Sequence, residues 1–140
     1  MPFHHILVPL DLSERTDRAA DLARDLAKAS GARVTLFHVV ETIALAGYDE
    51  FQSFYQELER RAARRLDHVA ARFEDSGLHV GTNIVCGRPV DEIVRFVVSE
   101  RVDLVVLMSH QVDLSRPGAG LGTLSYRLGV AAPCSVLLVK

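Results

Sequence analysis

Five short runs of β-branched and other apolar residues alternate with helical patterns, and this alternation constrains the fold more than any other feature of the chain. The runs read HILVPLD, ARVTLFHVV, LHVGTNIVCG, VDLVVLM and CSVLLVK, at residues 5–11, 32–40, 78–87, 102–108 and 134–140. Runs of this length and composition are typical of strands. Parallel strands require crossover connections, which are right-handed and lay helices on the faces of a sheet. The sequence therefore predicts an α/β fold, a five-stranded parallel doubly wound sheet with helices on both faces.

The helical segments carry apolar residues at three- and four-residue spacing. After the first strand, Ser13 is predicted to be the N-cap of a helix that ends at Gly31. A long helix follows the second strand, and we expect its apolar face to pack on the sheet with Phe54 in the core. That face comprises Phe51, Phe54, Tyr55, Leu58, Ala62, Leu66, Val69 and Phe73. Pro89 opens a third helix, and residues 122–132 can form a short fourth one.

The composition and charge indicate a globular domain that does not bind nucleic acid. The chain has 140 residues, of which 49% are hydrophobic and 24% charged. This length suits one domain, expected over residues 1–140. A formal net charge of -2 argues against a nucleic-acid partner, which would require a basic face. Four arginines cluster among acidic residues, and we interpret them as a solvated helix face: Arg60, Arg61, Arg64 and Arg65.

No sequence feature indicates a membrane or a metal as a partner. The first residues, MPFHHILVPLD, lack the basic start and the cleavage site of a signal peptide. No apolar run approaches the roughly 20 residues of a membrane span, and we expect a cytoplasmic protein without membrane contact. Cys86 and Cys134, the two cysteines, match no metal-ligand spacing and no disulfide framework. We therefore predict no metal site and expect both thiols to be buried and inert.

Ligands of doubly wound sheets bind outside the carboxyl ends of the strands, where the strand order switches. This rule selects the loops after the first and the fourth predicted strands. The P-loop pattern G-x-x-x-x-G-K-[ST] is absent from the chain, and so is the G-x-S-x-G turn of hydrolases. Ser109 lies beside His110, but adjacent residues on an extended chain point to opposite faces and cannot work together as in a triad. We therefore predict no catalytic residue.

Five segments of the chain occur in a particular order and spacing: HILVPLDLSE, LFHVV, GRPVDEIVRFV, VDLVVLMSH and GTLSYRLGVAAPCSVLLVK. Their order and spacing resemble those of the universal stress proteins of the UspA superfamily. The resemblance implies an adenine nucleotide alpha hydrolase-like fold, a homodimer and a stress-linked cytoplasmic role. In one branch of the family it also implies binding of ATP or a related adenine nucleotide. A C-terminal strand at the sheet edge would pair antiparallel with its two-fold mate, so we expect a homodimer through this strand.

The nucleotide-binding branch resembles a pattern G-x2-G-x9-G-[ST] that begins where the fourth strand ends, and this chain departs from it. Met108 and Gln111 stand at the first two glycine positions. Ten residues, 112–121, separate Gln111 from the closing pair Gly122 and Thr123, where the pattern has nine. Glycine at the first two positions lets the backbone approach a phosphate closely, and a Met or Gln side chain would fill that space. We therefore expect the loss of tight ATP binding.

Other positions of the family's site are retained. By the same match, Pro9, Asp11 and Val39 fall where the family surrounds adenine and ribose. The phosphate side is matched by Leu107, Ser109, Gly122, Thr123 and Leu124. An alternative is that Asp11 only caps the helix that follows it, and that the loop glycines only form a turn.

Two functions remain open at this point. The first, which we favour, is a non-catalytic dimeric stress protein that holds no cofactor and acts through protein partners that the sequence does not identify. The second is an adenine-nucleotide binder that admits ATP, with Mg, or another adenine nucleotide despite its altered loop, and that has at most a weak ATPase activity. Met108 and Gln111 favour the first function, whereas Asp11 with Gly122 and Thr123 favours the second.

Overall fold

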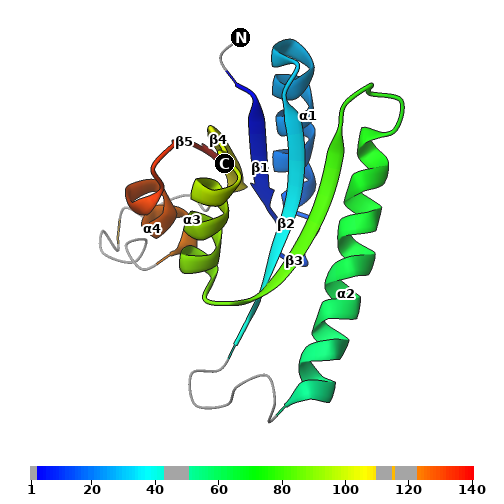
Figure 1. Ribbon diagram of the computed structural model, residues 1–140, viewed down its shortest axis with the longest axis vertical. Coiled ribbons are helices and arrows are strands. Elements are labelled where there is room, and N and C mark those ends of the chain that lie inside the picture. The colour runs from blue at the N-terminus through cyan, green and yellow to red at the C-terminus, as the bar shows by residue number, and fades with distance from the viewer. Residues whose placement is uncertain (1–2, 43–50, 110–114, 116–122) are drawn as a thin grey trace.

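Five parallel strands form the centre of the computed structural model, which describes residues 3–42, 51–109, 115 and 123–140 (Figure 1). Every strand pairing in the sheet is parallel, and the strand order is β3-β2-β1-β4-β5. The strands are β1 (His5–Pro9), β2 (Arg33–Glu41), β3 (Val80–Gly87), β4 (Leu104–Met108) and β5 (Ser135–Val139). The predicted five-stranded parallel sheet is therefore confirmed.

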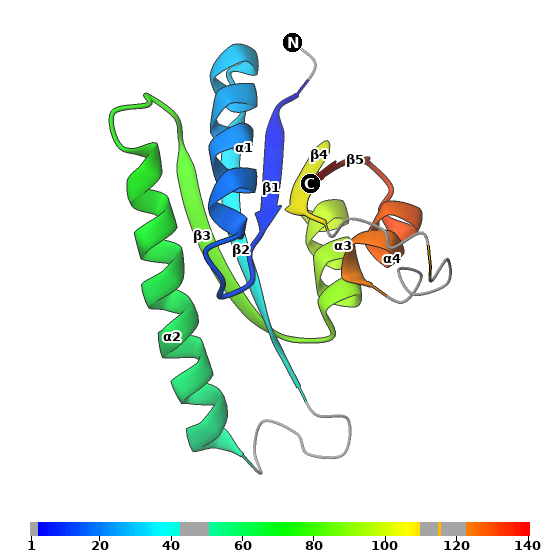
Figure 2. The same cartoon turned by 180° about the vertical axis from the view of Figure 1, so that it is seen from behind.

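Two pairs of helices cover the two faces of this sheet (Figure 1, Figure 2). One core cluster contains residues of α1 (Thr16–Ser30) and α2 (Gln52–Ala70), and the other contains residues of α3 (Pro89–Ser99) and α4 (Leu124–Ala131). From β1 the chain moves outward through β2 to β3, and it then returns across the sheet to β4 and β5. Because crossovers are right-handed, this reversal places the later helices on the opposite face. The strand order thus reverses between β1 and β4.

Helix α1 begins at Thr16, so the prediction that Ser13 is its N-cap is wrong. The Ser13 backbone N–H and hydroxyl both donate to Asp11 Oδ1, over 2.8 and 2.5 Å. This side-chain turn offers the backbone an alternative to the helix, and the helix starts only after it. The predicted end is confirmed, because Gly31 caps α1 with a left-handed φ of 71°.

Helix α2 buries a narrower face than the sequence predicts. Its buried residues are Tyr55, Ala62, Leu66 and Val69. Phe54 is 52% exposed, so the prediction that it belongs to the core is wrong. Successive residues of a helix are about 100° apart around its axis, and with Tyr55 fully buried its neighbour Phe54 faces outward. A short 3-10 helix, Ala71–Phe73, follows α2. Within the described part of the chain, no helix has the length and apolar character to cross a lipid bilayer.

Both cysteines are half-buried, which corrects the expectation that they are buried. The Cys86 thiol, on β3, donates to Glu59 Oε1 on α2 over 3.3 Å. Burial, and after it this hydrogen bond, raises the pKa of the Cys86 thiol to about 11. The thiolate is the nucleophilic form of cysteine, so Cys86 is a poor nucleophile at neutral pH.

Candidate functional site

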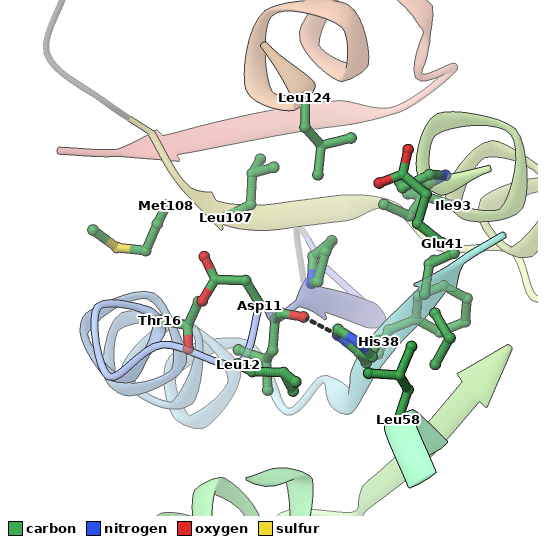
Figure 3. Close-up of a pocket in the computed structure, with 16 residues that line it drawn as sticks. Asp11, Leu12, Thr16, His38, Glu41, Leu58, Ile93, Leu107, Met108 and Leu124 are labelled. Atoms are coloured by element: carbon green, nitrogen blue, oxygen red, sulfur yellow. Dashed lines mark hydrogen bonds between the residues drawn. The ribbon is translucent and has the colours of Figure 1, made fainter. Parts of the chain in front are cut away.

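Two adjoining cavities lie at the carboxyl ends of β1 and β4, where the strand order reverses. The larger cavity has a volume of about 400 Å³ and lies between the strand ends and helices α2, α3 and α4 (Figure 3). The smaller cavity has a volume of about 280 Å³ and lies between the turn before α1, the end of β4 and the start of α4. The residues that line both cavities are Asp11, Leu107, Met108 and Leu124. The two cavities therefore adjoin each other at these four residues.

The structure brings most of the predicted site residues to these two cavities. The larger cavity is lined by Pro9, Asp11, Val39, Leu107, Met108 and Leu124. Thr123 lines the smaller cavity. Ser109 is 7% exposed and contacts the Ser125 hydroxyl of the cavity wall. Gln111 and Gly122 lie outside the described residues.

Asp11 is the carboxylate that the two cavities share. It follows β1, and its Oδ1 atom accepts the two hydrogen bonds from Ser13. These bonds hold the carboxylate at the strand end, where Figure 3 shows it between the Met108 and His38 side chains. Asp11 therefore stabilises the turn before α1 and does not cap that helix, so the alternative left open by the sequence is wrong in this respect. Asp11 lines the candidate site as well.

Arg65 of α2 also bonds to the turn that contains Asp11 and Ser13, a role that the sequence does not predict. Its Nη2 atom donates to the Ser13 carbonyl over 3.0 Å and also pairs with the Asp17 carboxylate. The Arg65 side chain is 14% exposed, so it is not part of a solvated face. Its neighbours Arg60 and Arg64 are 60% and 67% exposed, as predicted for the cluster. Helix α2 thus contributes to the position of Asp11 through Ser13.

His38 on β2 also lines the larger cavity, and no sequence pattern singled it out. Its Nδ1 atom lies 2.6 Å from the Leu10 carbonyl oxygen (Figure 3). A carbonyl oxygen only accepts, so Nδ1 carries the proton in this contact. The Leu10 N–H donates to the Phe37 carbonyl over 2.7 Å. The backbone carbonyl and the backbone N–H of Leu10 therefore both connect the turn after β1 to β2.

The remaining wall of the larger cavity is mostly apolar. Val39 and Ile93 come from β2 and α3, while Leu58 and Leu124 come from α2 and α4. Ile93 is 1% exposed and belongs to the core cluster under α3 and α4. Because this core fixes the wall, the cavity offers a preformed apolar surface to a ligand.

Met108 is the last residue of β4 and lines both cavities. Its half-buried side chain packs against the core cluster of α1 and α2, whereas Leu107 packs on the opposite face of the sheet. A glycine at this position would have no side chain in the wall that the cavities share. The position of Met108 therefore fits the expectation that its side chain takes up room near the site.

A row of hydroxyl groups adjoins the smaller cavity. Ser109 Oγ donates to Ser125 Oγ over 3.2 Å, and Ser125 Oγ lies 3.3 Å from Thr123 Oγ1. The Lys140 ammonium donates to Ser109 Oγ over 3.3 Å at the far end of the row. Thr123 also caps α4, because its Oγ1 accepts the Tyr126 N–H over 3.3 Å. Arg15, which precedes α1, completes the polar part of the cavity wall.

Comparisons with known proteins give one consistent result. Residues 2–140 match the model of the Universal stress protein family. A universal stress protein of Thermus aquaticus is 31% identical over 142 residues, with 99% of each chain covered. The structure of hypothetical protein MJ0577 of Methanocaldococcus jannaschii has a TM-score of 0.83 and 27% identity, covering 100% of this chain and 97% of that one. The universal stress protein of Archaeoglobus fulgidus in complex with dAMP has the same fold, with a TM-score of 0.72 and 17% identity over the whole of both chains.

Proposed function

Since the chain belongs to the universal stress protein family, we propose that it is a non-catalytic, homodimeric stress-response protein of the cytoplasm, with one domain over residues 1–140. In this proposal it binds an adenine nucleoside monophosphate. The observation that carries the proposal is the cavity of about 400 Å³ at the strand-order reversal, with the Asp11 carboxylate in its wall. The dAMP complex of the Archaeoglobus fulgidus relative supports the same class of ligand.

The residues of the larger cavity fit a nucleoside. Its volume of about 400 Å³ falls in the range of roughly 300–1,000 Å³ that small-molecule sites occupy. Val39, Ile93 and Leu124 offer apolar surface to a flat base. An ionised carboxylate is an acceptor, so Asp11 would accept a hydrogen bond from a ribose hydroxyl. The cavity thus favours the second of the two functions that the sequence left open.

The Met108 side chain limits the number of phosphate groups that we expect the site to accept. The family resemblance places glycine at this position in the chains that bind ATP, and this chain places a side chain in the wall that the two cavities share. The space left beyond the nucleoside is the cavity of about 280 Å³. We therefore expect one phosphate to be accepted and the longer chain of ATP to bind poorly, without turnover.

Titration calorimetry with AMP tests the proposal. We expect the unaltered protein to bind AMP, and we expect the Asp11→Asn variant to bind it about tenfold more weakly, because a hydrogen bond to a charged group is lost. Asparagine keeps an oxygen that can accept the Ser13 N–H, so the turn after β1 is preserved. If the unaltered protein does not bind AMP at millimolar concentration, the proposed function is wrong.

The homodimer is proposed through the edge strand β5. In the described sheet, β5 pairs only with β4 and leaves its other edge open. Leu137 on this strand is 36% exposed. An open edge with apolar side chains is a template for pairing with a second strand, and a two-fold mate satisfies both edges at once.

Analytical ultracentrifugation of an edge variant tests the dimer. We expect the unaltered protein to sediment as a dimer at micromolar concentration and Leu137→Arg to sediment as a monomer, because the charge would be buried at the strand pair. Val98→Arg is the matched control, since Val98 is 64% exposed and lies on helix α3 rather than on the edge strand. An unaltered protein that sediments as a monomer would exclude this assembly.

A further inference from the structure

Strand β3 forms the second open edge of the sheet, at the opposite end from β5 (Figure 1). Among the described strands it pairs only with β2, in register over all eight of its residues. Its sequence, VGTNIVCG, has neither a charged residue nor a proline, although edge strands commonly carry such residues to prevent further pairing. Gly81, Thr82 and Asn83 are exposed. This edge is therefore open to a further strand.

The hydrogen bonds to β2 show which backbone groups of β3 point to the open edge. The Val34 N–H donates to the His79 carbonyl over 2.9 Å. Backbone groups of successive strand residues point to alternate sides, so the odd-numbered residues of β3 bond to β2. The N–H and C=O groups that point outward are therefore those of Thr82, Ile84 and Cys86. A second β3 strand that runs antiparallel and is centred on Ile84 can exchange hydrogen bonds with all three residues.

Helix α2 has a defined register on β3, because the Cys86 thiol donates to Glu59 Oε1 over 3.3 Å. Since α2 connects the parallel strands β2 and β3, it runs opposite to them. The step along β3 from Cys86 back to Ile84 covers about 6.6 Å, which corresponds to about 4.4 residues of helix. Ala63 of α2 thus lies level with Ile84. A two-fold axis at Ile84 therefore also passes beside Ala63.

Arg60 and Asp67 are exposed and lie on the side of α2 that is turned to this edge. Glu59 contacts β3, whereas Arg65 bonds the Ser13 carbonyl in the turn after β1, so these two side chains mark opposite sides of the helix. At about 100° per residue, Arg60 is turned about 100° and Asp67 about 80° beyond Glu59. This direction leads away from Arg65 and toward the open edge.

We propose that β3 is a self-association surface, at which a second copy of this chain pairs antiparallel about a two-fold axis at Ile84. Neighbouring strands are about 4.8 Å apart, so β3 would lie about 2.4 Å and β2 about 7 Å from the axis. Helix α2 packs on both strands and would lie about 5 Å from the axis. The two α2 helices are then about 10 Å apart, which is the separation of packed helices.

The charges on α2 select a second copy as the partner. Arg60 precedes Ala63 by three residues and Asp67 follows it by four. The two-fold axis beside Ala63 therefore brings Arg60 of each copy to Asp67 of the other. The small Ala63 side chain leaves room for the helices to approach at the axis. This surface is thus complementary to itself in both backbone hydrogen bonds and charge.

Sedimentation equilibrium of Leu137→Arg over a series of concentrations tests the proposal. This variant blocks the edge at β5, so β3 is its remaining open edge and the result does not depend on whether β5 pairs. Because exposed ion pairs contribute little, we expect a monomer at micromolar concentration and dimers with a Kd of roughly 0.1–1 mM. A variant that remains monomeric at about 1 mM contradicts the proposal.

Charge reversal in the Leu137→Arg background tests the register of α2. Arg60→Asp and Asp67→Arg should each raise the Kd at least about tenfold, because each brings like charges together. A mixture of these two variants should associate again, since both ion pairs then form between different chains. Arg61→Asp is the matched control, because Arg61 is exposed and turned about 100° further from the edge than Arg60, and it should keep the Kd. A mixture that associates no better than its components would overturn the proposed interface.

Thr82→Pro in the same background tests the strand pairing itself. Proline removes an N–H that points to the open edge and no hydrogen bond to β2, so the sheet is preserved. Thr82→Ala keeps this N–H and is the matched control. We expect Thr82→Pro to raise the Kd at least about tenfold and to retain the circular dichroism spectrum of the background. A folded Thr82→Pro variant that dimerises with an unchanged Kd would show that the β3 strands do not pair.

Discussion

Replacing Arg65 with alanine should destabilise the protein more than its place in a charged cluster suggests. The Arg65 guanidinium joins α2 to the turn after β1, where it bonds the Ser13 carbonyl over 3.0 Å and pairs with Asp17. The Arg65 and Asp17 side chains are 14% and 23% exposed, so solvent screens this pair only in part. Arg65→Ala removes both contacts at once.

The expected cost follows from what remains after the substitution. Hydrogen bonds to charged groups contribute about 1.5–3 kcal/mol when they are partly buried. The Ser13 carbonyl keeps the Thr16 hydroxyl at 2.9 Å, and Asp17 keeps Arg72 Nη1 at 3.8 Å. Because these partners compensate in part, we expect a loss of about 2 kcal/mol in the free energy of unfolding. With an ordinary urea dependence, this loss lowers the denaturation midpoint by about 1 M.

Urea denaturation of Arg65→Ala and Arg60→Ala, followed by circular dichroism, is the assay. Arg60 lies on the same helix and forms an ion pair with Glu57 at 2.9 Å, but its side chain is 60% exposed. We therefore expect the midpoint of Arg60→Ala to stay close to that of the unaltered protein. If Arg65→Ala shifts the midpoint no further than Arg60→Ala does, Arg65 does not brace the turn and the reasoning is refuted.

Three further predictions concern the core, a thiol and a histidine. Leu66→Ala should cost about 3 kcal/mol in the free energy of unfolding and Phe54→Ala much less, because Leu66 is 1% exposed and Phe54 52%; equal urea midpoints would contradict the assigned faces of α2. Since the pKa of Cys86 is raised to about 11, its alkylation by iodoacetamide, followed by mass spectrometry, should be slow at pH 8 and accelerate toward that pH; rapid alkylation at pH 8 would disprove the raised pKa. Burial lowers the pKa of His5 below 6.5, so the unfolded chain binds a proton that the folded protein does not, and the urea midpoint should fall as the pH drops below 6.5. His5→Asn should lose part of this dependence and the exposed His4→Asn should keep it, and an unchanged dependence in His5→Asn would rule out His5 as its source.

The order of elements was predictable because each strand is a short apolar run bounded by turns. Once five parallel strands were predicted, the carboxyl ends of the first and fourth became the expected site. The structure places Asp11 and Met108, which follow and end these strands, in the walls of the same two cavities. These residues are 97 positions apart in the chain, and the strand order accounts for their proximity.

The residues that the sequence analysis missed act across the fold. Arg65 is one of four clustered arginines, and the pattern of charge does not show which of them faces the turn at Ser13, 52 residues earlier. Lys140 contacts Ser109 because β5 lies beside β4 in the sheet. Arg15 comes from a distant part of the chain, and the fold places it in the wall of the smaller cavity. Ser13 was assigned to a helix cap because caps and side-chain turns use the same residue types. Such choices depend on tertiary contacts that a single sequence does not display.

Parallel calorimetric titrations of the unaltered protein with AMP and with Mg-ATP test the central claim most directly. The claim is that the larger cavity binds the nucleoside, while Met108 in the shared wall limits the phosphate tail. We predict that AMP binds at least about tenfold more tightly than Mg-ATP, a difference of about 1.4 kcal/mol. Mg-ATP that binds as tightly as AMP, at micromolar Kd, would contradict the account.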